Sequence, residues 1–223
     1  MSTALKIEWL KLSRSAVAPW ASAIYLGGLI VVVGIVNIGL RLGNERLMAK
    51  VGSGPVQDWE GLVIQVSQVI MAGGTLTAGV VIAWLFAREY ADETIVLLMS
   101  TAVPRHHIAV AKFVMFLAWV IAVNVVLCVL LAAAGVSLGF GVGASIWQVL
   151  TLGIGTMWYV APIAWVATRT RSMLAGVGVT VIELLLLQVF GIVGAEIALV
   201  VVWPAVVLVG CWVTYVAWKH LEI

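Results

Sequence analysis

The chain has 223 residues, of which 64% are hydrophobic and only 10% are charged, and its mean hydropathy is +1.18. Soluble domains carry about 25% charged residues, so this composition excludes an ordinary soluble enzyme and indicates an integral membrane protein. The small net charge of +2 comes from Lys and Arg in short connections, which is typical of membrane orientation and does not suggest nucleic-acid binding. Cys128 and Cys211 fall inside apolar segments, so we interpret them as packing residues and not as a disulfide.

Residues 3–15 predict a short amphipathic helix at the start of the chain. One face of this helix would carry Leu5, Trp9, Leu12 and Ala16, whereas the basic residues fall mostly on other faces. We expect the helix to lie along the inner surface of the membrane. The alternative is a frayed start to the first membrane span. The stretch has no apolar core followed by a small-residue cleavage site, so we do not interpret it as a signal peptide.

Six apolar segments follow, and a helix needs about 20 residues to cross the hydrocarbon core of a bilayer. The segments are residues 17–40, 60–87, 108–134, 146–168, 173–195 and 203–218. The sequence therefore predicts an all-α fold, with six transmembrane helices in a single domain over residues 1–223. Six spans place both termini on the same side of the membrane.

The basic residues predict which side that is. Nine Lys and Arg residues fall on the terminal side of this layout, and only three, Arg41, Arg46 and Lys50, fall on the opposite side. Short cytoplasmic connections are enriched in Lys and Arg. We therefore expect both termini, and the connection between the second and third spans, to be cytoplasmic.

That connection, from Arg88 to Lys112, holds eight ionisable side chains that bracket the uncharged run from Thr94 to Val103. The ten residues of this run are too few to cross the hydrocarbon core, which needs about 20. A short apolar segment between charges lies on the lipid surface or in a groove on another protein. We favour binding in a groove on another protein.

The same run predicts a short helix. Asp92 or Thr94 can cap its first turn, and Pro104 ends it before the next span begins. The apolar face of this helix would consist of Ile95, Leu98 and Met99.

Several polar residues fall inside the predicted spans. Glu183 lies near the middle of the fifth span, where a carboxylate costs roughly 2.5 to 3.5 kcal/mol on insertion scales. We interpret it as a structural, hydrogen-bonded group; a proton relay, a cation site and a substrate contact are the alternatives. Gln65, Gln68 and Asn124 either line an internal cavity or form hydrogen bonds between helices.

The sequence contains no set of residues that indicates catalysis. The adjacent His106 and His107 have no Cys or carboxylate at metal-ligand spacing, so we expect no metal site. The chain has no GxxxxGK[ST] stretch, so a nucleotide would have to be bound by another chain.

Residues 86–112 resemble the cytoplasmic signature of type-2 ATP-binding-cassette (ABC) exporter permeases, such as those of bacitracin, lantibiotic and sodium export systems. In that family an acidic residue ends the second span, a Thr opens a short coupling helix with paired leucines, and a Pro followed by a basic residue leads into a third span that carries a Lys. The matching residues are Glu89, Thr94, Leu97, Leu98, Pro104, Arg105 and Lys112. Two positions differ, because Glu93 replaces a frequent Gly, and His106-His107 replaces small or basic residues.

The resemblance implies a permease subunit in the bacterial cytoplasmic membrane, paired as a homodimer with two cassette ATPases beneath it. ATP and magnesium would bind to the ATPase, and the substrate would be an amphipathic antibiotic, peptide or lipid. The residues that would couple to the ATPase are Glu89, Asp92, Thr94, Ile95, Leu97, Leu98, Pro104 and Arg105. The family often folds the segment after the fifth span back into the outer leaflet, and residues 189–203 would be its counterpart.

A transporter of another class is the main alternative. A proton- or ion-coupled secondary transporter or channel would use Glu183 and would need no ATPase. An intramembrane enzyme is disfavoured, because the sequence offers no nucleophile paired with a base and no set of metal ligands.

Overall fold

The computed structural model describes residues 2–51, 55–94, 104–193 and 196–219, and the side chains of 187–203 lie outside this description. The fold is all-helical throughout the described residues, which confirms the predicted class. The elements are α1 Ser2–Arg14, α2 Val17–Arg41, α3 Glu45–Val51, α4 Trp59–Val69, η1 Ile70–Gly74, α5 Thr75–Ala91, α7 Arg105–Ser137, α8 Ile146–Trp158, α9 Ile163–Thr170, α10 Met173–Val193 and α11 Glu196–Lys219.

Four helical segments are long and apolar enough to cross a membrane: Val17–Arg41, Trp59–Ala91, Arg105–Ser137 and Ile146–Thr170. They coincide with the first four predicted spans. Helices α10 and α11 occupy the fifth and sixth positions, but their described apolar parts are shorter, Met173–Leu186 and Pro204–Lys219. Six spans therefore remain a prediction. The chain is helical up to Val193 and again from Glu196. The segment predicted to fold back into the outer leaflet, residues 189–203, has side chains that the structure does not describe.

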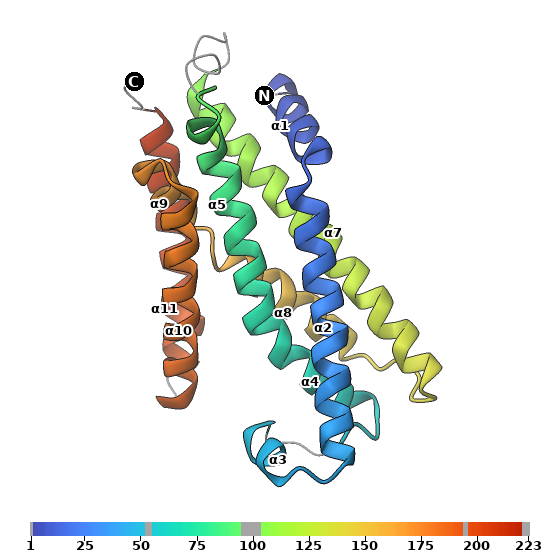
Figure 1. The fold of residues 1–223 in the computed structure, drawn as a ribbon. Coiled ribbons are helices and arrows are strands. Elements are labelled where there is room, and N and C mark those ends of the chain that lie inside the picture. Colours follow the sequence, from blue (N-terminus) through green and yellow to red (C-terminus); the bar gives the residue numbers. More distant parts are fainter. Residues whose placement is uncertain (1, 52–54, 95–103, 194–195, 220–223) are drawn as a thin grey trace.

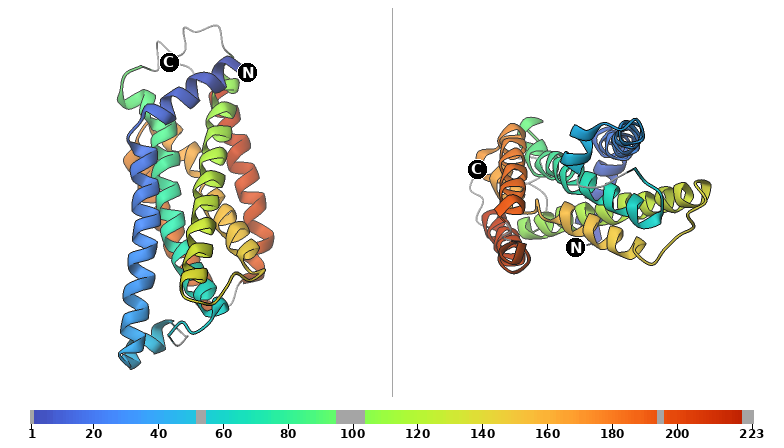
Figure 2. Two further views of the ribbon diagram at one scale, coloured as in Figure 1. Left: turned by 90° about the vertical axis from the view of Figure 1, so that its right-hand side faces the viewer. Right: turned by 90° about the horizontal axis from the view of Figure 1, so that it is seen from below.

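The two ends of the molecule differ. Helix α1, the end of α5, the start of α7 and the end of α11 lie at one end, and α3 lies at the other (Figure 1). Seen along the bundle, α10 and α11 lie on one side and α2 on the opposite side, with α5 between them (Figure 2). Helix α7 has 33 residues, so it is about 50 Å long and extends beyond the roughly 30 Å hydrocarbon core.

Helix α5 forms the centre of the bundle because its small residues let neighbouring helices approach closely. A Cβ atom at Gly79 would overlap with Thr180 of α10, and one at Gly176 would lie 2.7 Å from the Ala83 side chain. Ten of the 17 residues of this helix are buried, among them Ala78 and Val81. Small residues at such contacts are typical of helix packing in membranes.

Two long segments contain irregular backbone. The second is interrupted by the π-helical turn η1, and the fourth by a turn between α8 and α9 that includes Pro162, which has no backbone N–H. Irregular backbone at membrane depth is tolerated where protein covers it. Tyr159, Val160 and Ala161 in the second break are indeed buried.

Helix α1 lies where the sequence predicts an N-terminal helix, but its buried face differs from the prediction. The residues that pack against the rest of the protein are Ala4, Glu8 and Leu12, which are spaced four residues apart. Trp9 is exposed, as expected for a lipid-facing residue, whereas Leu12 is covered by protein. The helix therefore docks on the bundle through a face that contains a carboxylate.

Candidate functional site

The site begins with an ion pair between the two helices that flank residues 92–104. Glu89 lies in the last turn of α5, and Lys112 lies two turns into α7. Lys112 Nζ donates to Glu89 Oε1 at 2.6 Å and to the Leu85 carbonyl oxygen at 2.6 Å. The Lys112 side chain is fully buried and that of Glu89 is nearly so. The two helices are therefore tied together at the base of the connection.

Helix α1 completes the site with two more charges. Lys112 Nζ lies 3.5 Å from Glu8 Oε2. Lys11 Nζ lies 3.1 Å from Glu8 Oε1 and 3.0 Å from Glu89 Oε1. We call Glu8, Lys11, Glu89 and Lys112 the four-charge cluster. Its two carboxylates and two ammonium groups sum to zero, which is the condition under which buried charges are tolerated.

The surroundings of the cluster keep the Lys11 ammonium group charged. Burial lowers the pKa of Lys11, but the carboxylates of Glu8 and Glu89 raise it by more, so the pKa of Lys11 lies above its usual value. Lys112 Nζ lies 5.8 Å from the centre of the Phe86 ring and 5.7 Å from that of Trp218. Aromatic faces attract cations. Through Trp218, α11 becomes the fourth helix that contacts the cluster.

The predicted coupling residues are placed in three groups. Glu89 belongs to the four-charge cluster. Asp92 is exposed, and its carboxylate accepts a hydrogen bond from Arg88 Nε at 3.0 Å. Thr94 is also exposed, and its backbone N–H donates to the Glu89 carbonyl oxygen at 3.0 Å. At the other end of the connection, Pro104 precedes the first residue of α7, Arg105. Ile95, Leu97 and Leu98 lie outside the described residues, together with the predicted short helix.

Asp92 does not begin a helix within the described residues. It is the residue at which α5 ends, and its side chain turns back toward α5 to pair with Arg88. The proposed capping of a following helix by Asp92 or Thr94 falls at the edge of the description and stays a prediction.

Glu93 explains one departure from the family signature. Its φ angle is 55°, in the left-handed region that favours glycine. The resemblance places a frequent Gly at this position, and Gly is the residue that adopts such a conformation most easily. A non-glycine residue in this region costs about 1 to 2 kcal/mol.

We expect Glu93→Gly to leave the protein as stable as the wild type or up to about 1 kcal/mol more stable, because relief of strain exceeds the added entropy of the unfolded chain. Glu93→Val should lower stability, since a β-branched residue is a marked outlier at positive φ. Thermal unfolding of the purified variants in detergent measures the order. A Val variant as stable as the Gly variant would show that the left-handed turn is absent.

The intramembrane amides form contacts between helices. Gln65 Oε1 of α4 accepts from Asn37 Nδ2 of α2 at 3.0 Å, and Asn37 Oδ1 accepts from the Val56 backbone at 2.9 Å. Asn124 of α7 donates to the Val120 carbonyl oxygen at 2.9 Å and lies 3.3 Å from the sulfur of Met157. Gln65 thus bonds to another helix, whereas Asn124 bonds within α7 and contacts Met157 of α8, and the choice between interhelical bonding and a polar cavity stays a prediction. Gln68 is exposed.

Glu183 is buried on α10 with 7% of its surface exposed, close enough to Tyr159 at the α8–α9 break for an electrostatic interaction. Its Oε2 atom has no hydrogen-bond partner among the described residues. The structural and the ion-coupled interpretations of this residue both stay predictions.

Two members of the four-charge cluster, Glu8 and Lys11, were missed by the sequence reasoning. Glu8 itself could have indicated that α1 joins the cluster, because it is the only acidic residue before Glu45. A single carboxylate four residues from Leu12, in a helix rich in basic residues, lies on the face that turns out to be buried.

A family model described as "ABC-2 family transporter protein" matches residues 4–187, which is most of the chain. The chain belongs to the ABC-2 transporter family. The matched region includes all four residues of the cluster and ends within α10. Searches of curated proteins and of solved structures found no match. ABC-2 permeases are membrane components of transporters and normally work with an ATPase subunit.

Proposed function

We propose that this chain is the permease subunit of an ATP-driven exporter whose cassette ATPase is a separate chain. The observation that carries the proposal, together with the family, is the ion pair between Glu89 and Lys112. It joins the two helices that flank the connection to which the ATPase would dock. A displacement of that connection would reach α5 and α7 together.

The remaining charges extend this unit to α1. Glu8 and Lys11 tie α1 to the same two helices, so a force applied at residues 92–104 would act on three helices and not on one. Closure of an ATPase dimer on this connection would tilt the three helices and open a pathway at the far end. ATP and magnesium bind to the ATPase in this scheme, and two permease copies surround the pathway above two ATPases.

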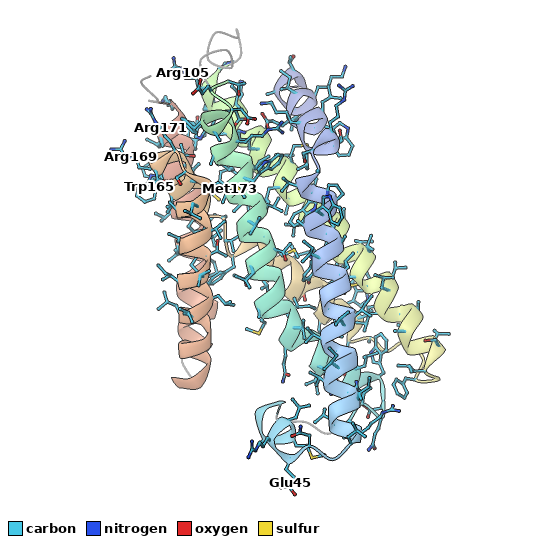
Figure 3. The ribbon with its side chains drawn as sticks, viewed as in Figure 1. Glu45, Arg105, Trp165, Arg169, Arg171 and Met173 are labelled. Carbon is cyan, nitrogen blue, oxygen red and sulfur yellow. The ribbon has the colours of Figure 1, made fainter. Side chains whose placement is uncertain are left out.

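The orientation proposed for the chain places the four-charge cluster on the cytoplasmic side of the bacterial membrane. Arg105, Arg169 and Arg171 lie at the same end of the molecule as α1, and Glu45 lies at the opposite end (Figure 3). Arg171 also packs over the Tyr90 ring at 5.6 Å. Basic residues at this end support cytoplasmic termini.

The substrate we propose is amphipathic, such as an antibiotic, a peptide or a lipid. Reconstitution into liposomes tests the driving force of transport. With the cassette ATPase and ATP on the same side of the liposome membrane, we expect substrate transport. This transport should stop when ATP is replaced by a non-hydrolysable analogue. Transport driven by a proton gradient without ATPase would favour the alternative, an ion-coupled transporter that uses Glu183.

We expect Glu183→Gln to retain ATP-driven transport within about twofold of the wild type, because the amide keeps the shape and hydrogen-bonding groups of the carboxyl while removing its charge. The rate of substrate export in the reconstituted system is the measurement. Abolished transport in a variant that still folds and binds the ATPase would support the ion-coupled alternative.

A further inference from the structure

An apolar groove runs between α2 and α7 on the half of the molecule away from the termini. Its volume is about 480 Å³, within the range typical of small-molecule sites. It is lined by Leu29 and Val33 of α2, by Leu127 and Leu131 of α7, and by Leu62 and Val66 of α4. Among the residues that line it, Arg41 is the only charged one.

Specific contacts of α2 with its neighbours differ along the groove. Near the terminal end, Trp119 Nε1 of α7 donates to Ser22 Oγ of α2 at 3.0 Å, which keeps the helices close there. Farther along, Asn37 bonds to Gln65 and to the Val56 backbone, which holds α2 against α4 and not against α7. The helices diverge toward the end that carries α3 (Figure 1). The groove thus forms because α2 is bonded to α7 near the termini and to α4 toward the opposite end of the molecule.

The length of the groove matches one leaflet of a bilayer. Along α2 its hydrophobic lining residues extend from Leu26 to Ile38, a rise of roughly 18 Å at 1.5 Å per residue. One leaflet contributes about 15 Å of hydrocarbon. Arg41 follows one turn beyond Ile38, at the level expected for lipid headgroups. Its side chain is exposed and forms no ion pair with any residue that the structure describes.

We propose that this groove binds an acyl chain of an anionic phospholipid from the leaflet opposite the termini, with Arg41 on the headgroup phosphate. The apolar walls select a hydrocarbon chain, and a guanidinium at the end of the groove pairs well with a phosphate. A cation at headgroup depth that pairs with no acidic residue in the described part of the chain complements an anionic lipid better than the apolar surface of a second protein chain does. The proposal does not depend on the driving force of transport.

Glycines on α2 offer a matched pair of variants. A Cβ atom at Gly34, which lines the groove, would meet nothing within 4 Å, and the same is true of Gly28, which does not line it. Gly34→Leu therefore adds a side chain to the wall of the groove at a position where its Cβ atom meets no neighbour, and Gly28→Leu adds the same side chain elsewhere on the same helix. Arg41→Gln removes the headgroup contact, and Arg46→Gln on α3 removes an exposed charge at the same end of the molecule.

The test is native mass spectrometry of the purified, delipidated chain titrated with phosphatidylglycerol and with phosphatidylcholine of the same acyl length. We expect the wild type to prefer phosphatidylglycerol, and Arg41→Gln to lose about fivefold of that preference. Gly34→Leu should weaken binding of both lipids. Arg46→Gln and Gly28→Leu should behave as the wild type.

Two outcomes would overturn the proposal. Equal lipid binding by each variant and its control would show that the groove is not the lipid site. Unchanged lipid binding together with a shift from dimer to monomer in Gly34→Leu, measured by light scattering, would show that a second copy of the chain occupies the groove.

Discussion

Lys112→Met is expected to destabilise the protein by about 3 to 5 kcal/mol, the range seen when one partner of a buried ion pair is removed. The variant leaves the buried carboxylates of Glu8 and Glu89 with one ammonium group between them. Methionine has a similar length and fills the space beside Phe86. The loss of stability therefore comes mainly from the missing charge and not from a cavity. Thermal unfolding in detergent, followed by tryptophan fluorescence, measures the change.

Two further variants separate charge balance from other effects. Arg88→Gln removes an ion pair with Asp92 whose side chains are 34% and 51% exposed, and should change stability by only about 0 to 1 kcal/mol. Lys112→Met combined with Glu89→Gln restores a net charge of zero and should recover much of the lost stability. The cluster would not be a buried, balanced network if Lys112→Met resembled Arg88→Gln, or if the double variant were less stable than the single one.

Leu98→Asp is expected to release the ATPase while leaving membrane insertion and pairing of the permease nearly intact. Leu98 lies outside the described residues, so this prediction rests on the sequence. Enclosing its side chain in a groove on the ATPase contributes roughly 1.5 to 3 kcal/mol, and a carboxylate there would be desolvated without a partner. Substrate-stimulated ATP hydrolysis should fall to the rate of the ATPase alone.

A leucine at the other end of the molecule provides the control. Leu42 follows α2, is 81% exposed, and lies outside the proposed ATPase side. Leu42→Asp introduces the same charge and should retain wild-type ATPase binding. A pull-down in detergent excludes any contribution of lipid contact. Equal recovery of ATPase by wild type and Leu98→Asp would support the alternative, in which this segment lies on the membrane surface.

The sequence predicted the helical segments well, because long apolar runs in a membrane protein have few other structures available. The first four spans agree with the structure to within about four residues at each end. Glu89 and Lys112 were also identified, by resemblance, as part of one functional region. The two residues lie 23 positions apart, and only the folded hairpin of α5 and α7 brings them to 2.6 Å.

The docking of α1 was not predictable from periodicity alone. Leu5, Trp9 and Leu12 suggested a lipid-facing stripe, whereas the stripe covered by protein contains Glu8. A hydrophobicity pattern treats a carboxylate as a solvent-facing group, and it does not register that a buried lysine on another helix provides a partner. Lys112 is such a partner, more than 100 residues away in the sequence.

The groove between α2 and α7 was also beyond the sequence. Gln65 was recognised as a polar residue inside a predicted span, but its pairing with Asn37 depends on the relative rotation of α2 and α4. That rotation decides which side of α2 remains uncovered. The rotation of α2 depends on the packing of three helices, which the spacing of residues along one segment does not predict.

The measurement that tests the central claim most directly is the composition of the complex formed by this chain. A tagged copy purified from its native membrane in mild detergent should carry a cassette ATPase in a one-to-one ratio, determined by mass spectrometry of the intact complex. The Leu98→Asp variant, purified in parallel, should carry none. Purification of the folded wild-type chain with no ATPase, together with transport driven by a proton gradient alone, would contradict the account.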